Sequence, residues 1–310
     1  MTDPIWIDTD MGFDDLAAIL MVRASGRPIG GLSLVAGNAG LPQVITNAMA
    51  CRPLFGWDFP IHAGAGAALN GTQVDAGYVL GATAMPSAGR QLPPCPDAPD
   101  GYYAVDALAT WLDLGGRAVL ALGPLTNIAL LLAARPDLAA RMELTWMGGS
   151  ATAGNHTATA EFNAFADPEA VAQVIAAGVT IRMVGLDCCR QVTVTAADAA
   201  ALRNLPGERA ALLADLLTGY ACIRDPAGID PMPLFDPVAA AAILNPKLLS
   251  FTTARLDCEL HGTLTRGMTV IEWRAARAAP NALIATRASK ARIRRLFLDG
   301  LLAAATGETP

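Results

Sequence analysis

Residues 5–15 of this 310-residue chain read IWIDTDMGFDD, and this stretch decides the fold. Apolar residues fill its first part, which is typical of a buried strand, and four carboxylates then follow within eight residues. The next segment, DDLAAILMVRAS at 14–25, has the alanine and leucine content of a helix. A strand that leads directly into a helix indicates a βαβ unit, so we expect the carboxylates at the carboxyl edge of a sheet.

The same alternation of strands and helices continues along the chain. Further strands are predicted at 29–38, 118–123, 144–149 and 180–187, and further helices at 44–55, 125–134 and 167–178. We therefore predict one α/β domain over 1–310, with an open, mostly parallel mixed sheet flanked by helices and a Rossmann-like core. The Gly-, Pro- and Ala-rich stretch 78–103 has no clear period and is predicted to be a lid loop.

Composition and charge indicate which class of ligand the protein binds and in which cellular compartment it is expected. The net charge is −6 and only two lysines occur, so no nucleic-acid surface is expected. The most apolar run, 118–134, is broken by Gly, Pro, Thr and Asn, so no membrane span is expected either. The first residues lack a signal-peptide pattern, and the six cysteines are scattered, which favours a cytoplasmic protein. A small neutral substrate, or one held through a cation, fits this composition best.

The acidic cluster itself predicts a metal site. Asp8 and Asp10 are two apart on a strand, and Asp14 and Asp15 open the next helix. A lone Asp at a helix start is usually an N-cap, but that role does not explain Asp10 and Asp15 as well. Two such charges about 4 Å apart repel by roughly 4 kcal/mol at an effective dielectric near 20, and a hard cation removes that repulsion. Oxygen ligands without His or Cys favour Ca²⁺ or Mg²⁺.

Phosphoryl transfer is the rival interpretation, because Asp-x-Asp after a strand also begins phosphatases of the haloacid dehalogenase type. That class has Thr two residues after the second Asp, where this chain has Gly12. It also needs a later lysine, and neither Lys247 nor Lys290 has an acidic pair near it. We therefore rank this rival low.

A series of motifs resembles the inosine–uridine-preferring nucleoside hydrolase family. The series begins with Asp8-Thr9-Asp10-x-Gly12-x-Asp14-Asp15 and continues in order over residues 5 to about 272. Its later members are Val35-Ala36-Gly37-Asn38, Gly123-Pro124-Leu125-Thr126-Asn127, Met147-Gly148-Gly149, Gly154-Asn155, Ala160-Glu161-Phe162-Asn163, Asp167-Pro168-Glu169-Ala170, Asp236-Pro237 and 262–267. One motif alone is weak, whereas the ordered series is specific.

This resemblance implies a nucleoside hydrolase-like fold and a calcium-dependent hydrolysis of the N-glycosidic bond of ribonucleosides. The implied Ca²⁺ ligands are Asp10, Asp15, Asp236 and the backbone carbonyl of Thr126. Asp10 is implied to be the general base that activates a calcium-bound water. The implied substrate contacts are Asn155 and Glu161 at the 5′-hydroxyl, Asp14, Asn163 and Asp236 at the ribose, and Asn38, Met147 and Phe235 along the pocket. For Asp167, in contrast, a structural helix cap is the preferred interpretation.

The chain departs from the family where the leaving base must be activated. Many members have His directly before the last Asp-Pro motif and a second His in the lid, where this chain has Phe235 and Leu80. Of the histidines present, His62 and His261 are predicted to be structural, and His156 to lie on a loop surface. We therefore expect slow turnover of inosine and uridine, with purines ahead of simple pyrimidines.

Two alternative functions stay open beside the main hypothesis. One is hydrolysis of a modified nucleoside or another N-ribosyl compound, and the other is non-catalytic binding of ribonucleosides. The resemblance also implies a homodimer or homotetramer and a role in nucleoside salvage or catabolism.

Overall fold

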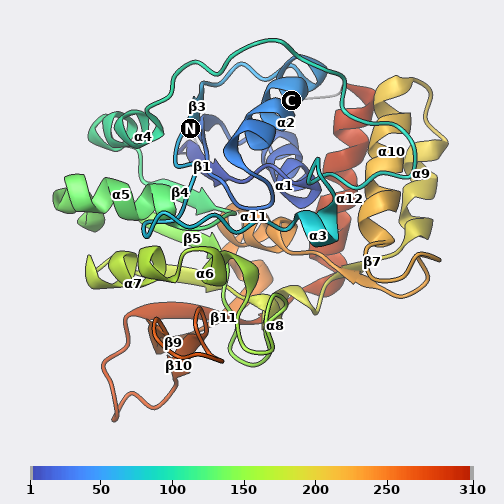
Figure 1. The fold of residues 1–310 in the computed structure, drawn as a ribbon. Helices are drawn as coiled ribbons and strands as arrows, with labels where there is room; N and C mark the ends of the chain where they lie inside the picture. Colours follow the sequence, from blue (N-terminus) through green and yellow to red (C-terminus); the bar gives the residue numbers. More distant parts are fainter. Residues whose placement is uncertain (1–2, 308–310) are drawn as a thin grey trace.

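A nine-stranded sheet with helices on both faces forms the centre of the protein, as seen in a computed structural model that describes residues 3–307 (Figure 1). The strands of this sheet are β1 (Ile5–Thr9), β2 (Ile29–Leu34), β3 (Ile61–Ala63), β4 (Ala118–Ala121), β5 (Glu143–Met147), β6 (Ile181–Val184), β9 (Leu249–Cys258), β10 (Thr269–Glu272) and β11 (Ala282–Ala288). A separate pair of short strands, β7 (Thr193–Val194) and β8 (Met232–Pro233), is antiparallel. The predicted mostly parallel mixed sheet is confirmed.

The order of the strands places a crevice beside β1. The sheet runs β10-β9-β11-β6-β5-β4-β1-β2-β3, and every neighbouring pair from β11 to β3 is parallel. The chain moves outward from β1 to β3 and then returns to the other side of β1 with β4. Ligands of open α/β sheets bind at such a reversal, beyond the carboxyl ends of the strands. Only β9 and β10 add antiparallel pairings at the far edge.

Two apolar layers cover the sheet. The longer helices are α1 (Phe13–Ala24), α2 (Leu41–Phe55), α4 (Ala104–Asp113), α5 (Thr126–Ala134), α7 (Pro168–Ala176), α10 (Glu208–Ala221), α11 (Asp236–Leu244) and α12 (Lys290–Thr306). The shorter ones are α3 (Gly77–Leu80), α6 (Phe162–Ala166), α8 (Leu186–Cys189) and α9 (Ala200–Arg203), with 3₁₀ turns at 136–140, 196–199 and 246–248. Helices α1, α2, α10, α11 and α12 share one core, and α4, α5 and α7 share the other.

Strand β1 separates these two cores because its side chains alternate. Ile5 and Ile7 pack in the first core, whereas Trp6 packs in the second and donates from Nε1 to Ser33 Oγ at 2.9 Å. After β1 the chain turns through Met11, which is buried and has a φ of 49°. A left-handed backbone at a residue other than Gly is strained. This turn brings Asp10, which follows β1, close to Asp15 at the start of α1.

The predicted lid is only partly irregular. It contains the single-turn helix α3, which has no buried residue, and the chain then continues without regular structure from Gly81 to Tyr103. In Figure 1 this long segment runs from α3 past α10, where the Arg90 amide donates to Asp215, and then around the rim of the molecule to α4. Within residues 3–307, no helix is both long and apolar enough to cross a membrane.

Candidate active site

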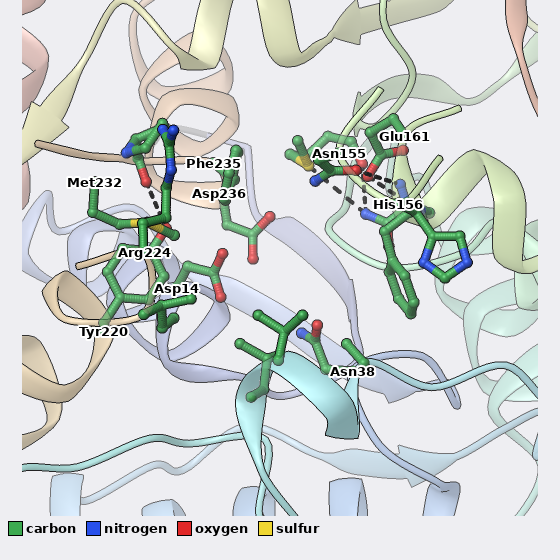
Figure 2. Close-up of a pocket in the computed structure, with 18 of the residues that line it drawn as sticks. Asp14, Asn38, Asn155, His156, Glu161, Tyr220, Arg224, Met232, Phe235 and Asp236 are labelled. Carbon is green, nitrogen blue, oxygen red and sulfur yellow. Dashed lines mark hydrogen bonds between the residues drawn. The ribbon is translucent and has the colours of Figure 1, made fainter. Parts of the chain in front are cut away.

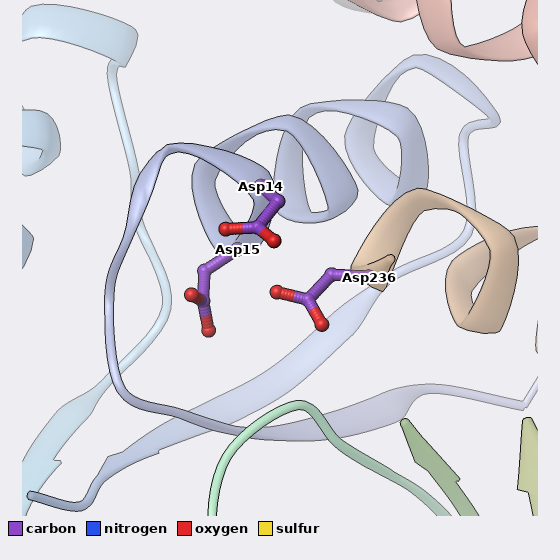
Figure 3. Close-up of side chains that lie close together, drawn as sticks. All are labelled: Asp14, Asp15 and Asp236. Carbon is purple, nitrogen blue, oxygen red and sulfur yellow. The ribbon is translucent and has the colours of Figure 1, made fainter. Parts of the chain in front are cut away.

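A buried acidic cluster lies where β1 meets the start of α1. Asp14, Asp15 and Asp236 each place a carboxylate oxygen within 4.8 Å of the others (Figure 3). Gly12 is the N-cap of α1, so Asp14 is not the N-cap that its place in the sequence suggested, and its carboxylate points toward Asp236 instead. Asp236 itself is the first residue of α11. Two helix starts therefore present their acidic side chains to the same point.

Asp15 and Asp10 are held by a network around Asn38. Asp15 accepts hydrogen bonds from Thr9 Oγ1 at 2.5 Å and from the Gly12 amide at 2.8 Å. Asp10 accepts from the backbone amide of Asn38 at 2.7 Å. The Nδ2 atom of Asn38 then joins both acids, at 3.0 Å from Asp10 Oδ1 and 3.1 Å from Asp15 Oδ2. Asp10 is thus an immediate neighbour of the cluster.

Burial makes these carboxylates hard to ionise without a counter-charge. Burial, followed by the charge of Asp15, raises the pKa of Asp14 to about 7 and the pKa of Asp10 well above its usual range. The same two causes raise the pKa of Asp236, and burial raises the pKa of Asp15. Three fully buried acids and the half-buried Asp14, with oxygen donors only, are the surroundings that a hard divalent cation requires. The residues present therefore fit such an ion.

Thr126 is the first residue of α5. The turn before it packs against Asp10: a Cβ added to Gly123 would lie 3.1 Å from the Asp10 carboxyl carbon. The Thr126 hydroxyl points elsewhere and donates to Asp167 at 2.8 Å. Asp167 also accepts from the Ala170 amide at 3.0 Å, so the predicted helix-cap role of Asp167 is confirmed.

A cavity of about 420 Å³ opens directly above the acids (Figure 2). It is lined by all eight residues for which a substrate contact was expected, namely Asp14, Asn38, Met147, Asn155, Glu161, Asn163, Phe235 and Asp236. Asn155, His156 and Glu161 lie at one end, and Tyr220, Arg224, Met232 and Phe235 lie at the other. Asp14 and Asp236 point into the space between these ends.

The end that contains Asn155 has fixed polar groups. Glu161 caps α6 and accepts from the amides of Gly149, Asn163 and Ala164 at 2.8–3.0 Å. A helix begins between Glu161 and Asn163, because Glu161 is its N-cap and Asn163 lies in its first turn. Burial nevertheless raises the pKa of Glu161 to about 7.

Asn163 and Asn155 each keep one side-chain amide atom free to hydrogen-bond a ligand. Asn163 donates from Nδ2 to the carbonyls of Leu122 and Met147 at 2.7 and 2.9 Å, so its Oδ1 can accept from a ligand. Asn155 accepts from the Phe162 amide at 2.9 Å through Oδ1, so its Nδ2 can donate. A sugar hydroxyl both donates and accepts hydrogen bonds, so one free acceptor and one free donor suit it.

His156 is not confined to the loop surface, as the sequence suggested, but lines the cavity. Its Nδ1 lies 2.9 Å from the Tyr78 hydroxyl on α3, and its ring packs on Phe162 and Phe165. His62 stacks on Trp6, whereas His261 lies in the β9–β10 loop and not in a strand.

Several cavity residues were not identified from the sequence, among them Arg190, Tyr220, Ile223, Arg224 and Met232. They come from the end of α8, from α10 and from the segment that leads to β8, where no motif marks them. Only their proximity in the fold reveals them.

An open α/β sheet with an acid-lined cavity at the carboxyl edge of its strands is typical of an enzyme site, and comparison with known proteins identifies the family. The family model for inosine-uridine preferring nucleoside hydrolases matches residues 5–295, and the chain belongs to this family. Relatives are N-glycosyl hydrolases, so ribonucleoside hydrolase activity is supported for this enzyme.

Individual relatives cover nearly the whole chain. A pyrimidine-specific ribonucleoside hydrolase, RihA, of Shewanella woodyi is 38% identical over 280 residues, which are 88% of this chain and 89% of that protein. RihA of Photobacterium profundum is 36% identical over 279 residues, with the same coverage of the two chains. Among solved structures, the plant nucleoside hydrolase PpNRh1 has a TM-score of 0.88 at 26% identity, covering 98% of this chain and 100% of that one. The purine-preferring ribonucleoside hydrolase of Gardnerella vaginalis has a TM-score of 0.87 at 24% identity and covers 97% and 99%, which supports the fold alone.

Proposed function

We propose that this enzyme hydrolyses the N-glycosidic bond of ribonucleosides with Ca²⁺ at the acidic cluster and Asp10 as general base. One observation supports this proposal above all: all eight expected substrate contacts line a single cavity, which opens over the acidic cluster of Asp14, Asp15 and Asp236. Asp10, Asp15, Asp236 and the Thr126 carbonyl would hold the ion. When bound, Ca²⁺ would offset the negative charge of the cluster and acidify the attacking water.

The residues of the chain then orient the ribose and move the proton. Asn38 fixes both oxygens of Asp10, so the carboxylate has one orientation in which to take a proton from the attacking water. Asp14 and the free Oδ1 of Asn163 would accept from the 2′- and 3′-hydroxyls, and Asn155 with Glu161 would bind the 5′-hydroxyl. The transition state has oxocarbenium character, so the surrounding carboxylates stabilise it.

The preferred base is a second part of the proposal. The curated relatives above are named pyrimidine-specific, which supports uridine and cytidine as first substrates to test. The sequence argument from the absent histidines favours purines and easily departing bases instead. A panel of ribonucleosides, assayed by release of ribose with Ca²⁺ and with EDTA, decides between them.

Three outcomes of that panel would change the proposal. Full activity in EDTA removes the metal from the mechanism. Turnover of modified nucleosides alone supports the narrower N-ribosyl hydrolase. Binding without turnover of any riboside supports the non-catalytic alternative.

We extend the proposal to a cytoplasmic homodimer or homotetramer that acts in nucleoside salvage or catabolism. Light scattering of the purified protein measures its oligomeric state.

A further inference from the structure

The two ends of the cavity carry different chemistry. Asn155, His156 and Glu161 lie at one end, and Arg224 and Phe235 lie at the opposite end (Figure 2). A ribose held over the acids with its 5′-hydroxyl toward Asn155 directs its C1′ atom, and therefore the base, toward Arg224 and Phe235. This placement rests on the proposed function.

His156 is consequently at the wrong end to protonate the base. It lies beside Asn155, and its Nδ1 is occupied by the Tyr78 hydroxyl at 2.9 Å. Tyr220 lies at the base end, but its hydroxyl donates to the Pro233 carbonyl at 2.7 Å. Phe235 has no polar side-chain atom. The base end therefore lacks a neutral donor that is free to act.

Arg224 is the remaining polar side chain at that end. It lines the cavity at an exposed position, and within residues 3–307 its guanidinium makes no ion pair or hydrogen bond. Arg190, the other arginine of the cavity, is occupied, since it donates to the carbonyls of Ala153 and Gly154 at 2.9 and 2.7 Å. The turn after Arg224 is held by Asp225, which accepts from the amides of Ala227 and Ile229 at 3.0 Å.

We propose that Arg224 is a catalytic residue that stabilises the departing base by donating hydrogen bonds to it. When the C1′–N bond breaks, its electron pair goes to the base, and the negative charge spreads to ring nitrogens and exocyclic oxygens. A planar guanidinium with five N–H donors matches such acceptors and keeps its own protons. Water supplies the hydroxyl that bonds to C1′, and the base takes its proton from solvent after it leaves. Arg224 thus replaces the absent histidine by electrostatic stabilisation instead of proton transfer.

Leaving-group dependence tests this role. Arg224→Gln and Arg224→Lys would be compared with the unmodified enzyme on uridine, inosine and 4-nitrophenyl riboside, whose leaving group departs without help. We expect kcat on the nucleosides to fall about 10²-fold, as when one oxyanion donor is removed, and kcat on the nitrophenyl compound to change less than about threefold. Arg190→Gln is the matched control: it loosens the loop that carries Asn155, so it should slow all three substrates alike.

The pH dependence provides a second test that does not rely on a variant. An arginine guanidinium is not deprotonated in proteins, so the ratio of kcat for uridine to kcat for the nitrophenyl riboside should stay constant from about pH 6 to 8, where uridine itself is neutral. A ratio that falls with rising pH would reveal a titrating acid and overturn the proposal. Equal losses on all substrates in Arg224→Gln, or no loss on any, would overturn it as well. An unmodified enzyme that cleaves none of the three contradicts the proposed function itself.

Discussion

Replacing Asp10 by asparagine separates catalysis from stability. The substitution keeps the size of the side chain but removes the proposed base and one negative charge. We expect kcat to fall by at least about 10²-fold, because general-base catalysis alone contributes about 10²–10⁴-fold. The fold should persist, because the amide oxygen of the substituted side chain can still accept from the backbone amide of Asn38, as the Asp10 carboxylate does at 2.7 Å.

The effect on stability should change sign with calcium. Asp10 and Asp15 share the Asn38 Nδ2 donor, so their carboxylates are close neighbours. Two full charges about 6 Å apart repel by about 3 kcal/mol at an effective dielectric near 20, and this is an upper bound because the raised pKa of Asp10 lets a proton relieve the repulsion. Against this, the Asp10→Asn variant loses the bond from Asn38 Nδ2, which contributes about 1 kcal/mol. Without calcium, Asp10→Asn should therefore be more stable by about 1–2 kcal/mol, a rise of a few degrees in Tm.

Calcium should reverse that order. An ion at about 100 times its Kd stabilises the native enzyme by about 2.7 kcal/mol, and the variant, with one ligand charge fewer, should gain much less. Thermal unfolding of both proteins in EDTA and in calcium measures the crossing, and ribose release measures kcat. The matched control is Asp8→Asn, which removes a buried carboxylate from the same strand, outside the cavity, and should keep most of the activity. Near-normal kcat in Asp10→Asn, or stability curves that do not cross, would refute the reasoning.

Three further predictions concern the sugar, the metal and the base. 2′-Deoxyribonucleosides should react at least about 10²-fold more slowly than ribonucleosides, because Asp14 and Asn163 would lose a hydroxyl partner, and equal rates would contradict the ribose contacts. Thr126→Val should lose about 1 kcal/mol of unfolding free energy with the bond to Asp167 yet keep its calcium affinity, and calorimetry showing a large loss of affinity would argue against the carbonyl as ligand. Phe235→His should raise inosine turnover and leave the nitrophenyl riboside rate unchanged, whereas an equal rise on both would show an effect on the sugar and not on the base.

The sequence predicted the sheet well because each strand is read from a local pattern. The strand at 5–9 and the helix after it are marked by their apolar pattern and composition alone, whereas the order of the strands and the reversal beside β1 are known only from the structure. The antiparallel β9 and β10 at the far edge were not predicted, since their pairing depends on which sheet edge remains free. A local sequence pattern carries no information about which edge of a sheet is free.

The detailed geometry of the acidic cluster was also beyond the sequence. Met11 adopts a φ of 49°, which no pattern predicts for a residue other than Gly, and this turn makes Gly12 rather than Asp14 the N-cap of α1. Glu161 caps a short helix that was not among the predicted elements, because three backbone amides converge on its carboxylate. In both places tertiary contacts overrule the local preference.

The contrast between the ends of the cavity explains why the motifs identify the sugar side and not the base side. Asn163 donates to backbone carbonyls at the carboxyl ends of β4 and β5, and Glu161 accepts from the amide of Gly149, which follows β5. These two side chains therefore also hold the backbone of the sheet edge in place, which restricts the residue types that fit there. Arg224 extends from a turn whose backbone is held by Asp225, and its own side chain supports nothing else within residues 3–307. Such a position can change without disturbing the fold, so a change of base preference needs no change in the sugar site. Substitution of Phe235 should therefore alter the ratio of purine to pyrimidine turnover, substitution of Arg224 should slow both, and 2′-deoxyribonucleosides should stay equally poor substrates in either variant. A variant at either position that accepted 2′-deoxyribonucleosides would show that the two ends are coupled.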